Sequence, residues 1–313
     1  MNRKIRIVVL GLGGVGGYLG GLLARAYAKG DKYEIVFIAR PSTEAIINEK
    51  GLQVMTLSEN FTVFPDVVAS TAKGISEADI VICSVKSYDL QESLSNIANI
   101  IGPQTLILPL LNGVNNTDII QQMFPEAMVA EGCIYIVSRR ESAGIIKMSG
   151  TSHVLYFGSS TIPANVLAGL NDCLKGAGIN SSIPENITQT IWEKFVFISA
   201  IATLTSCADK SIGALLENNV LKNQLIGLLS EAIAIAKGLS IPLPDDMIDR
   251  AIKKMEQQPY DTTSSMHSDF KNGGKTEYLS LTGYIVEQGL KLHIPTPFYD
   301  VMLDVLKNKT AAH

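Results

Sequence analysis

The chain has 313 residues, of which 46% are hydrophobic, so it is long enough to form two domains with well-filled cores. Its formal net charge of -4 offers no basic footprint for nucleic acid, and its longest uncharged apolar stretch, residues 195–208, is too short and too rich in serine and threonine to span a membrane. Its four cysteines and four histidines show no metal-ligand spacing, which predicts no metal site and favours reduced thiols in a cytoplasmic protein.

A short apolar stretch rich in β-branched residues, residues 5–10, runs directly into a glycine-rich turn and then into an apolar helical pattern. The turn has the G-x-G-x-x-G spacing and consists of Gly11, Leu12, Gly13, Gly14, Val15 and Gly16. Gly11 permits a sharp turn, Gly13 lets a pyrophosphate approach the backbone, and Gly16 lets the helix pack against the strand. The free N–H groups and positive dipole end of the helix then face the phosphates. This strand–turn–helix pattern predicts a Rossmann-type dinucleotide-binding domain, with a glycine-rich turn that binds nothing as the alternative.

Residues 34–40 predict the second parallel strand, whose carboxyl end meets the adenosine ribose in a nucleotide-binding fold. An NAD-specific fold has an acidic residue at that point, whereas this strand ends in Arg40 and carries Glu34 at its other end. Because a guanidinium group binds phosphate bidentately, Arg40 favours NADP over NAD. The alternative is a solvated surface arginine.

Residues 79–86 and 105–113 predict two further buried strands, which end in Lys86 and in Asn112-Gly113. Ligands of an open parallel sheet lie beyond the carboxyl ends of its strands. We therefore expect Lys86 and Asn112 at the same edge of the sheet as Arg40 and the glycine turn.

Additional β-structure is expected around this sheet. Residues 54–57 and 61–68 predict a hairpin. Three later segments are expected to extend the sheet with antiparallel strands: residues 129–137, 144–148 and 153–157. Residues 164–176 predict a helix and residues 179–183 a short final strand.

Beyond Pro184 the chain shows only helical patterns: residues 186–208, 215–238, 244–257, 276–292 and 298–307. The predicted fold class is α/β, with an N-terminal Rossmann-type dinucleotide-binding domain followed by an all-α C-terminal domain. We expect the NADP-binding domain to span residues 1–183 and the substrate domain to span residues 184–313.

Lys194 is the first candidate for chemistry, because it precedes a long apolar run with no further charge until Asp209. A lysine at the head of a buried helix can donate a hydrogen bond to a ketone oxygen and protonate the alkoxide that hydride transfer creates. The alternative is a lysine that extends to solvent and only caps an apolar helix.

A second candidate group lies in the polar residues 259–269 and in Glu277. Clustered hydroxyls, among them Ser264 and Ser265, can hold a carboxylate with neutral donors, and Glu277 can pair with a lysine. The alternatives are a Ser/Thr helix cap and a first-turn carboxylate favoured by the helix dipole.

The whole chain resembles the ketopantoate reductase (2-dehydropantoate 2-reductase) family. The resemblance rests on motifs that occur in the family's order over nearly all of the chain: Gly11-Leu12-Gly13-Gly14-Val15-Gly16, Val85-Lys86-Ser87-Tyr88, Leu111-Asn112-Gly113-Val114, Trp192-Glu193-Lys194, Ser264-Ser265-Met266 with Asp269, and Thr276-Glu277. It implies a Rossmann domain and an α-helical C-terminal domain, with NADPH as the cofactor.

The resemblance also implies roles for individual residues. Lys194 matches the catalytic lysine that hydrogen-bonds the 2-oxo group and supplies the proton. Glu277 matches the carboxylate that contacts substrate or cofactor, and Ser265 the serine that binds the substrate carboxylate. The cofactor side is completed by the glycine turn and by Asn112 near the nicotinamide, together with Arg40, Lys86, Ser138 and Glu277.

Three positions depart from the family pattern. Members that act on ketopantoate have asparagines one and two turns after the catalytic lysine and a third before a later glycine, where this chain has Ile198, Ala202 and Ile212. An apolar wall leaves a substrate hydroxyl without a partner. These positions make a less polar 2-oxo acid the alternative substrate.

The sequence thus predicts a cytoplasmic enzyme that reduces ketopantoate to pantoate for pantothenate and coenzyme A biosynthesis, with hydride transfer to C2 and Lys194 as general acid. The alternatives are a reductase of a less polar 2-oxo acid, a non-catalytic NADP-binding sensor, and a hydroxyacid-type dehydrogenase that shares only the first domain. The expected partner is a small 2-oxo acid, not nucleic acid or membrane, and a homodimer is left open.

Overall fold

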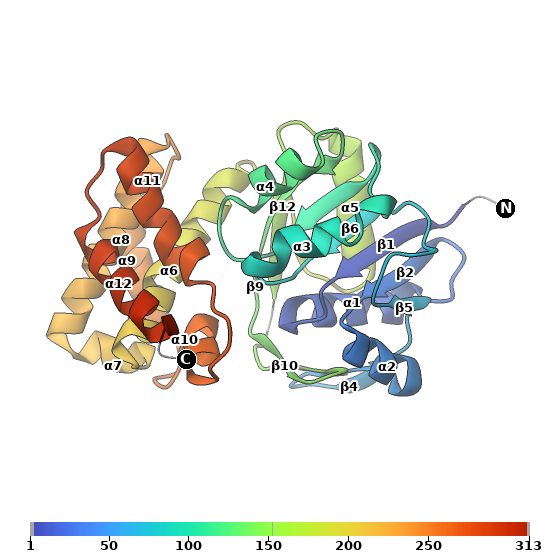
Figure 1. The fold of residues 1–313 in the computed structure, drawn as a ribbon, viewed down its shortest axis with the longest axis horizontal. Coiled ribbons are helices and arrows are strands. Elements are labelled where there is room, and N and C mark those ends of the chain that lie inside the picture. The colour runs from blue at the N-terminus through green and yellow to red at the C-terminus, as the bar shows by residue number, and fades with distance from the viewer. Residues whose placement is uncertain (1–2, 152, 312–313) are drawn as a thin grey trace. The chain divides into compact units, whose positions relative to one another are not determined.

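The computed structural model describes residues 3–151 and 153–311, which form two compact units (Figure 1). The first unit comprises the chain up to Leu111 together with Asn115–Ile187. The second comprises Asn112–Val114 and the chain from Thr188 onward. The division after Ile187 lies slightly beyond the boundary expected after residue 183, and no sequence pattern indicated that Asn112–Val114 belongs with the second unit.

A six-stranded parallel sheet organises the first unit, in the order β5-β2-β1-β6-β7-β8. Its strands, in chain order, are β1 (Ile5–Leu10), β2 (Tyr33–Ile38), β5 (Val67–Ala69), β6 (Ile80–Cys83), β7 (Leu106–Pro109) and β8 (Met128–Val129). Within this sheet the strand order is that of a doubly wound dinucleotide-binding fold, and it reverses direction between β1 and β6. The predicted α/β class with an N-terminal Rossmann-type domain is confirmed.

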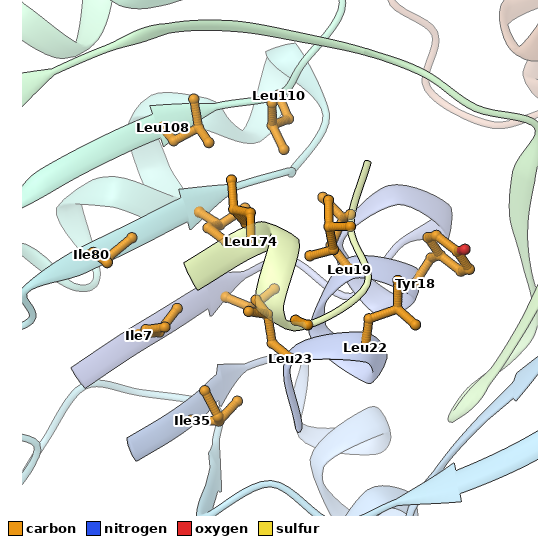
Figure 2. Close-up of a cluster of buried hydrophobic side chains, with 14 of the residues drawn as sticks. Ile7, Tyr18, Leu19, Leu22, Leu23, Ile35, Ile80, Leu108, Leu110 and Leu174 are labelled. Atoms are coloured by element: carbon orange, nitrogen blue, oxygen red, sulfur yellow. The ribbon is translucent and has the colours of Figure 1, made fainter. Parts of the chain in front are cut away.

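Both faces of the sheet are covered, so its strands are nearly continuous apolar runs. One face contributes Ile7, Ile35 and Ile80 to a core with helices α1 (Gly14–Tyr27) and α5 (Ala164–Gly176). Figure 2 shows these side chains near Leu19 and Leu23 of α1 and Leu174 of α5. The opposite face packs against α3 (Leu90–Ser95) and α4 (Asn116–Met123). The sequence analysis did not predict α3, α4 or α2 (Pro41–Lys50), because these short helices carry few apolar residues.

A second sheet of four strands, in the order β10-β11-β3-β4, contacts α1. Its strands are β3 (Leu52–Met55), β4 (Asn60–Val63), β10 (Ser138–Ser142) and β11 (Ile145–Met148). The predicted hairpin is present as β3 and β4, but the single strand expected over residues 61–68 is wrong. Pro65 lies between β4 and β5, and the Asp66 carboxylate accepts the N–H groups of Lys29 and Ile35, both at 2.8 Å. The chain therefore passes from one sheet to the other at this point.

The expectation that residues 129–157 extend the main sheet with antiparallel strands is also wrong. Only β8 joins that sheet, and it is parallel. Strands β9 (Glu131–Tyr135) and β12 (Val154–Gly158) form a third sheet with β13 (Ser181–Ser182), whereas β10 and β11 pair beside β3. Strand β11 alternates between buried and more exposed residues, as a strand with one covered face does, whereas the main sheet requires burial on both faces.

Among the residues that the structure describes, the regular elements of the second unit are all helical. Its helices are α6 (Ile187–Ala208), α7 (Ile212–Glu217), α8 (Asn219–Gly238), α9 (Met247–Glu256), α10 (Ser265–Lys271), α11 (Tyr284–Leu292) and α12 (Pro297–Ala311), with a π-helical turn, η3 (Leu279–Gly283), before α11. The single helix expected over residues 215–238 is divided, because the Asn218 side chain caps α8 by accepting the N–H groups of Val220 and Leu221. The polar stretch around Ser264 contains α10, which was not predicted as a helix.

Helix α6 contributes many residues to the hydrophobic core of this unit. Within the described part of the chain it alone is long and apolar enough to cross a membrane by length and composition, but 72% of that window is buried. Its residues Phe195, Val196 and Leu204 belong to the hydrophobic core of the second unit. The burial is that of a core helix, not of a lipid-facing one.

Candidate functional site

The glycine turn at the end of β1 has the backbone that the sequence pattern requires. Gly11 has φ +90, and a side chain there would approach the backbone N of Val85 to 3.0 Å. A Cβ at Gly16 would overlap the carbonyl oxygen of Gly11 and the hydroxyl of Ser84. Only glycine therefore permits this close approach of α1 to the turn.

Gly13 differs from these two glycines, because a Cβ added to it would meet no described atom within 4 Å. Gly13 is also the N-cap residue of α1, and no side chain caps that helix. The first turn of α1 contains no acidic residue. Bare backbone beside open space at the positive end of a 14-residue helix is an arrangement that fits a pyrophosphate.

Two serines hold the turn in place. The Ser84 hydroxyl, just after β6, donates to the carbonyl oxygen of Gly11 at 2.9 Å, and the Ser138 hydroxyl of β10 donates to that of Gly14, also at 2.9 Å. The Ser138 carbonyl lies so close to Gly14 that a Cβ there would overlap it. Ser138 was expected near the cofactor from the resemblance, but Ser84 was missed, because its partner lies 73 residues earlier in the chain.

The remaining cofactor candidates of the first unit lie around the same edge of the sheet. Arg40 follows β2, its side chain is 73% exposed, and it forms a 3.3 Å ion pair with Asp89. Lys86 follows β6 and is half-buried. Leu12 is buried and Val15 packs against the core, so within the turn these two residues face the protein.

In the second unit the structure brings two of the predicted residues together. Lys194, on α6, is only 8% exposed, and its Nζ donates a hydrogen bond to Oδ1 of Asn112 at 3.2 Å. Asn112 lies in the segment after β7, where Gly113 has φ +104 and Val114 packs against the core of the second unit. Among the described lysines and arginines Lys194 alone is buried, and a buried ammonium group requires polar partners.

Glu277 is the second buried candidate, with 4% exposure. Its carbonyl oxygen accepts the N–H of Leu281 at 3.1 Å and the hydroxyl of Ser280 at 3.0 Å, so it is fixed at the start of η3. The neighbouring Thr276 hydroxyl is buried and has no hydrogen-bond partner among the described residues. A buried hydroxyl of this kind leaves a donor for a bound molecule, and it was not predicted.

Ser265 is exposed and is the first residue of α10. Ser264, and not Ser265, caps this helix by accepting the N–H of His267 at 3.0 Å. The cap interpretation therefore holds for Ser264, and it leaves the Ser265 hydroxyl outside the cap.

The positions that depart from the family pattern are apolar and packed. Ile198 and Ala202 follow Lys194 by one and two turns on one face of α6; Ile198 is half-buried and Ala202 fully buried. Ile212, at the start of α7, is buried in the same core. The residues one and two turns after Lys194 on this helix therefore carry hydrocarbon side chains and no hydrogen-bonding group.

Burial keeps at least two of the cysteines in the protonated thiol form. None of the four cysteines, all of which lie in the described residues, forms a disulfide bond, and the pKa values of Cys83 and of Cys207 are raised by burial to about 12. No group of three or more histidine, cysteine, aspartate or glutamate side chains in the described residues could hold a metal ion.

Known proteins share this architecture over nearly the full length of the chain. A family model for ketopantoate reductase PanE/ApbA matches residues 7–161, and the model for its C-terminal part matches residues 186–310. An uncharacterized oxidoreductase of Bacillus subtilis, YkpB, is 25% identical over 95% of this chain and 96% of its own. The 2-dehydropantoate 2-reductase of Pyrococcus abyssi is 26% identical over 98% of each chain.

A solved structure agrees with these sequence matches. The crystal structure of 2-dehydropantoate 2-reductase from Porphyromonas gingivalis is 31% identical, with a TM-score of 0.85 over 97% of this chain and 99% of its own. The resemblance inferred from the sequence motifs is confirmed. The chain belongs to the ketopantoate reductase family and is an oxidoreductase of that family.

Proposed function

We propose that the protein is an NADPH-dependent 2-dehydropantoate (ketopantoate) reductase, which forms pantoate for pantothenate and coenzyme A biosynthesis. The observation that carries the proposal is the buried Lys194 amine, hydrogen-bonded to Asn112 in the second unit. The uncapped, open glycine turn of the first unit supports dinucleotide binding. Relatives such as the Pyrococcus abyssi enzyme carry this activity in their names.

In this proposal Lys194 is the general acid. The bound nicotinamide supplies a hydride to C2 of the 2-oxo acid. The Lys194 ammonium donates a hydrogen bond to the carbonyl oxygen and then gives its proton to the alkoxide oxygen, which leaves a neutral amine and a 2-hydroxy acid. Asn112 orients the amine through the 3.2 Å hydrogen bond before the substrate arrives.

Ser265 binds the carboxylate of the substrate in this proposal, because its residue is exposed and its hydroxyl lies outside the helix cap. Glu277, a buried residue just before η3, contacts substrate or cofactor in this proposal. The unpaired Thr276 hydroxyl beside it offers a further donor.

The proposed cofactor is NADP. Arg40 follows the second strand of the sheet, where the ribose of a bound dinucleotide lies in this fold class. Its guanidinium group is largely exposed and makes one long ion pair, so it is available to bind a 2′-phosphate. Lys86 at the end of β6 adds positive charge on the same edge.

A second candidate is the reduction of a less polar 2-oxo acid on the same scaffold. Ile198 lies one turn from Lys194, and neither it nor Ala202 or Ile212 offers a hydrogen-bond partner for the hydroxyl of ketopantoate. A hydroxyl left unpaired in an apolar site weakens binding.

The test is NADPH consumption by the purified protein with two matched substrates, ketopantoate and 3,3-dimethyl-2-oxobutanoate, which lacks only the hydroxyl. A higher kcat/KM for ketopantoate supports the first candidate, and a higher value for the hydroxyl-free acid supports the second. Tight NADPH binding without turnover of either acid, or of a wider panel of 2-oxo acids, would instead support a non-catalytic sensor. Cysteines without disulfide bonds fit the proposed cytoplasmic location.

A further inference from the structure

Three fully buried hydroxyl groups on α6 each pair with a hydroxyl of another helix or turn. Ser199 lies 2.8 Å from the Tyr299 hydroxyl of α12, and Thr203 lies 2.6 Å from the Thr282 hydroxyl of η3. Thr205 lies 2.9 Å from the hydroxyl of Ser264, which caps α10. A hydroxyl in an apolar core is costly unless it is paired, so each pair fixes one element against α6 in a single register.

The hydrogen-bond directions of the Thr205–Ser264 pair are determined by its neighbours. The backbone N–H of His267 donates to Ser264 Oγ at 3.0 Å, and the Thr205 hydroxyl donates to the carbonyl oxygen of Ile201 at 2.7 Å. The Ser264 hydroxyl must therefore donate to Thr205. The result is a directed chain of three hydrogen bonds from the first turn of α10 to the backbone of α6.

A second contact holds the same helix. His267 Nε2 lies 2.6 Å from Oδ1 of Asp209, which follows α6 directly and has φ 52. Helix α10 is thus attached to the end of α6 on both sides of Ser265, through Ser264 and through His267. The position of the Ser265 backbone is consequently set by α6.

The Thr203–Thr282 pair has the corresponding effect on Glu277. Thr282 lies in η3, and this turn is hydrogen-bonded to the Glu277 carbonyl oxygen through Leu281 and Ser280. Lys194 itself lies on α6, eleven residues or about three turns before Thr205 and therefore on nearly the same face. One rigid helix thus carries the amine and both anchors.

We propose that Thr203 and Thr205 are positioning residues, whose hydroxyl pairs hold Glu277 and Ser265 in a fixed arrangement relative to Lys194. The roles of these three groups rest on the proposed function, whereas the anchoring rests on the hydroxyl pairs. The Ser199–Tyr299 pair is the internal control, because α12 carries no residue of the proposed site.

The test compares Thr205→Val and Thr203→Val with Tyr299→Phe, each of which removes one hydroxyl and leaves a similar shape. For each variant we would measure kcat, KM for the 2-oxo acid, the Kd of NADPH, thermal stability, and amide hydrogen exchange. Thr205→Val is expected to raise KM about tenfold, because Ser265 is displaced, with a smaller change in kcat. Thr203→Val is expected to lower kcat/KM by a similar factor through Glu277. Tyr299→Phe should lose stability while KM and kcat stay at wild-type values.

The conservative variants Thr205→Ser and Thr203→Ser keep the hydroxyl group, so their kcat and KM should stay at the wild-type values. Hydrogen exchange should become faster over residues 264–268 in Thr205→Val, over 278–283 in Thr203→Val and at the start of α12 in Tyr299→Phe. Equal KM values for Thr205→Val and Tyr299→Phe would overturn the kinetic role. If the wild-type protein reduces no 2-oxo acid, the proposed function fails, and exchange alone decides the anchoring: unchanged exchange over residues 264–268 in Thr205→Val would overturn it.

Discussion

The glycine turn of the first unit is a candidate site built from backbone, whereas the candidate site of the second unit is built from side chains. At the glycine turn the important features are missing side chains: a Cβ at Gly16 would overlap its neighbours, and none is present at Gly13 to obstruct a phosphate. In the second unit the important features are a buried ammonium, a buried carboxylate and the hydroxyl pairs that position them. A backbone site is specified by a few adjacent residues, whereas a side-chain site depends on the packing of distant helices.

The largest expected effect concerns the second unit alone. Lys194→Ala removes the proposed proton donor, so kcat/KM for the 2-oxo acid should fall by about a hundredfold to ten-thousandfold, while the Kd of NADPH stays near its wild-type value. Steady-state kinetics measures kcat/KM, and fluorescence titration measures the Kd of NADPH. Lys237→Ala, which removes an exposed lysine near the end of α8, is the matched control and should leave both unchanged.

Two glycine variants test the backbone-built site. Gly16→Ala forces the new methyl group into the Gly11 carbonyl and the Ser84 hydroxyl, so it should destabilise the protein by about 1–3 kcal/mol. Gly13 has φ -75, and a Cβ added to it would meet no described atom within 4 Å, so the thermal stability of Gly13→Ala should match that of the wild type. Its NADPH affinity should fall at least about tenfold, because the added methyl group occupies the position of the pyrophosphate. Thermal unfolding and NADPH titration separate the two. Equal loss of stability in both variants would refute the distinction.

Arg40→Ala should weaken NADPH binding about tenfold and leave NADH binding unchanged, because only NADPH carries the 2′-phosphate. Arg250→Ala serves as the control, since Arg250 is also an exposed, ion-paired arginine but lies on α9. If the ratio of the Kd values for NADPH and NADH is the same in Arg40→Ala as in the wild type, the assignment of NADP is contradicted.

The smallest expected effect is a dependence of stability on pH in the first unit. Burial lowers the pKa of His153 below 6.5, and its Nε2 accepts the N–H of Asn180 at 3.0 Å. Below about pH 6.5 the unfolded chain therefore binds a proton that the folded chain does not, so stability should fall as the pH drops through this range and stay constant above it. Thermal unfolding at about pH 7.5 and about pH 5.5 should show a smaller difference for His153→Gln than for the wild type. An equal difference in both proteins would exclude His153 as the cause.

The sequence predicted most accurately the elements with local determinants. The strand from Ile5, the glycine turn and helix α5 lie where their apolar periods and glycines indicated. The strands after β8 were placed in the wrong sheet, because short β-rich segments do not reveal their partners and β11 pairs with β3, more than ninety residues earlier.

Within the site, Lys194 was indicated by its place before a long apolar run and Asn112 by its place after a buried strand. Their contact at 3.2 Å joins positions 82 residues apart. Ser84 and Thr205 were not predicted, and Thr276 was noted only as part of the Thr276-Glu277 motif without a role, because the role of a serine or threonine depends on partners that only the folded structure shows. For Ser84 one signal was available: it is the first polar residue after a buried strand, and this strand neighbours the one that enters the glycine turn. For Thr205 no local pattern exists.

The most direct test of the account is a single-turnover measurement on wild type, Gly13→Ala and Lys194→Ala at saturating NADPH, with the 2-oxo acid that the wild type reduces best. Gly13→Ala is expected to need more NADPH but then to transfer hydride at close to the wild-type rate. Lys194→Ala is expected to bind NADPH normally and to transfer hydride far more slowly. Hydride transfer at the wild-type rate in Lys194→Ala would contradict the assignment of the catalytic site to side chains of the second unit. Loss of NADPH binding in Lys194→Ala would contradict the separation of that site from the glycine turn that binds the cofactor.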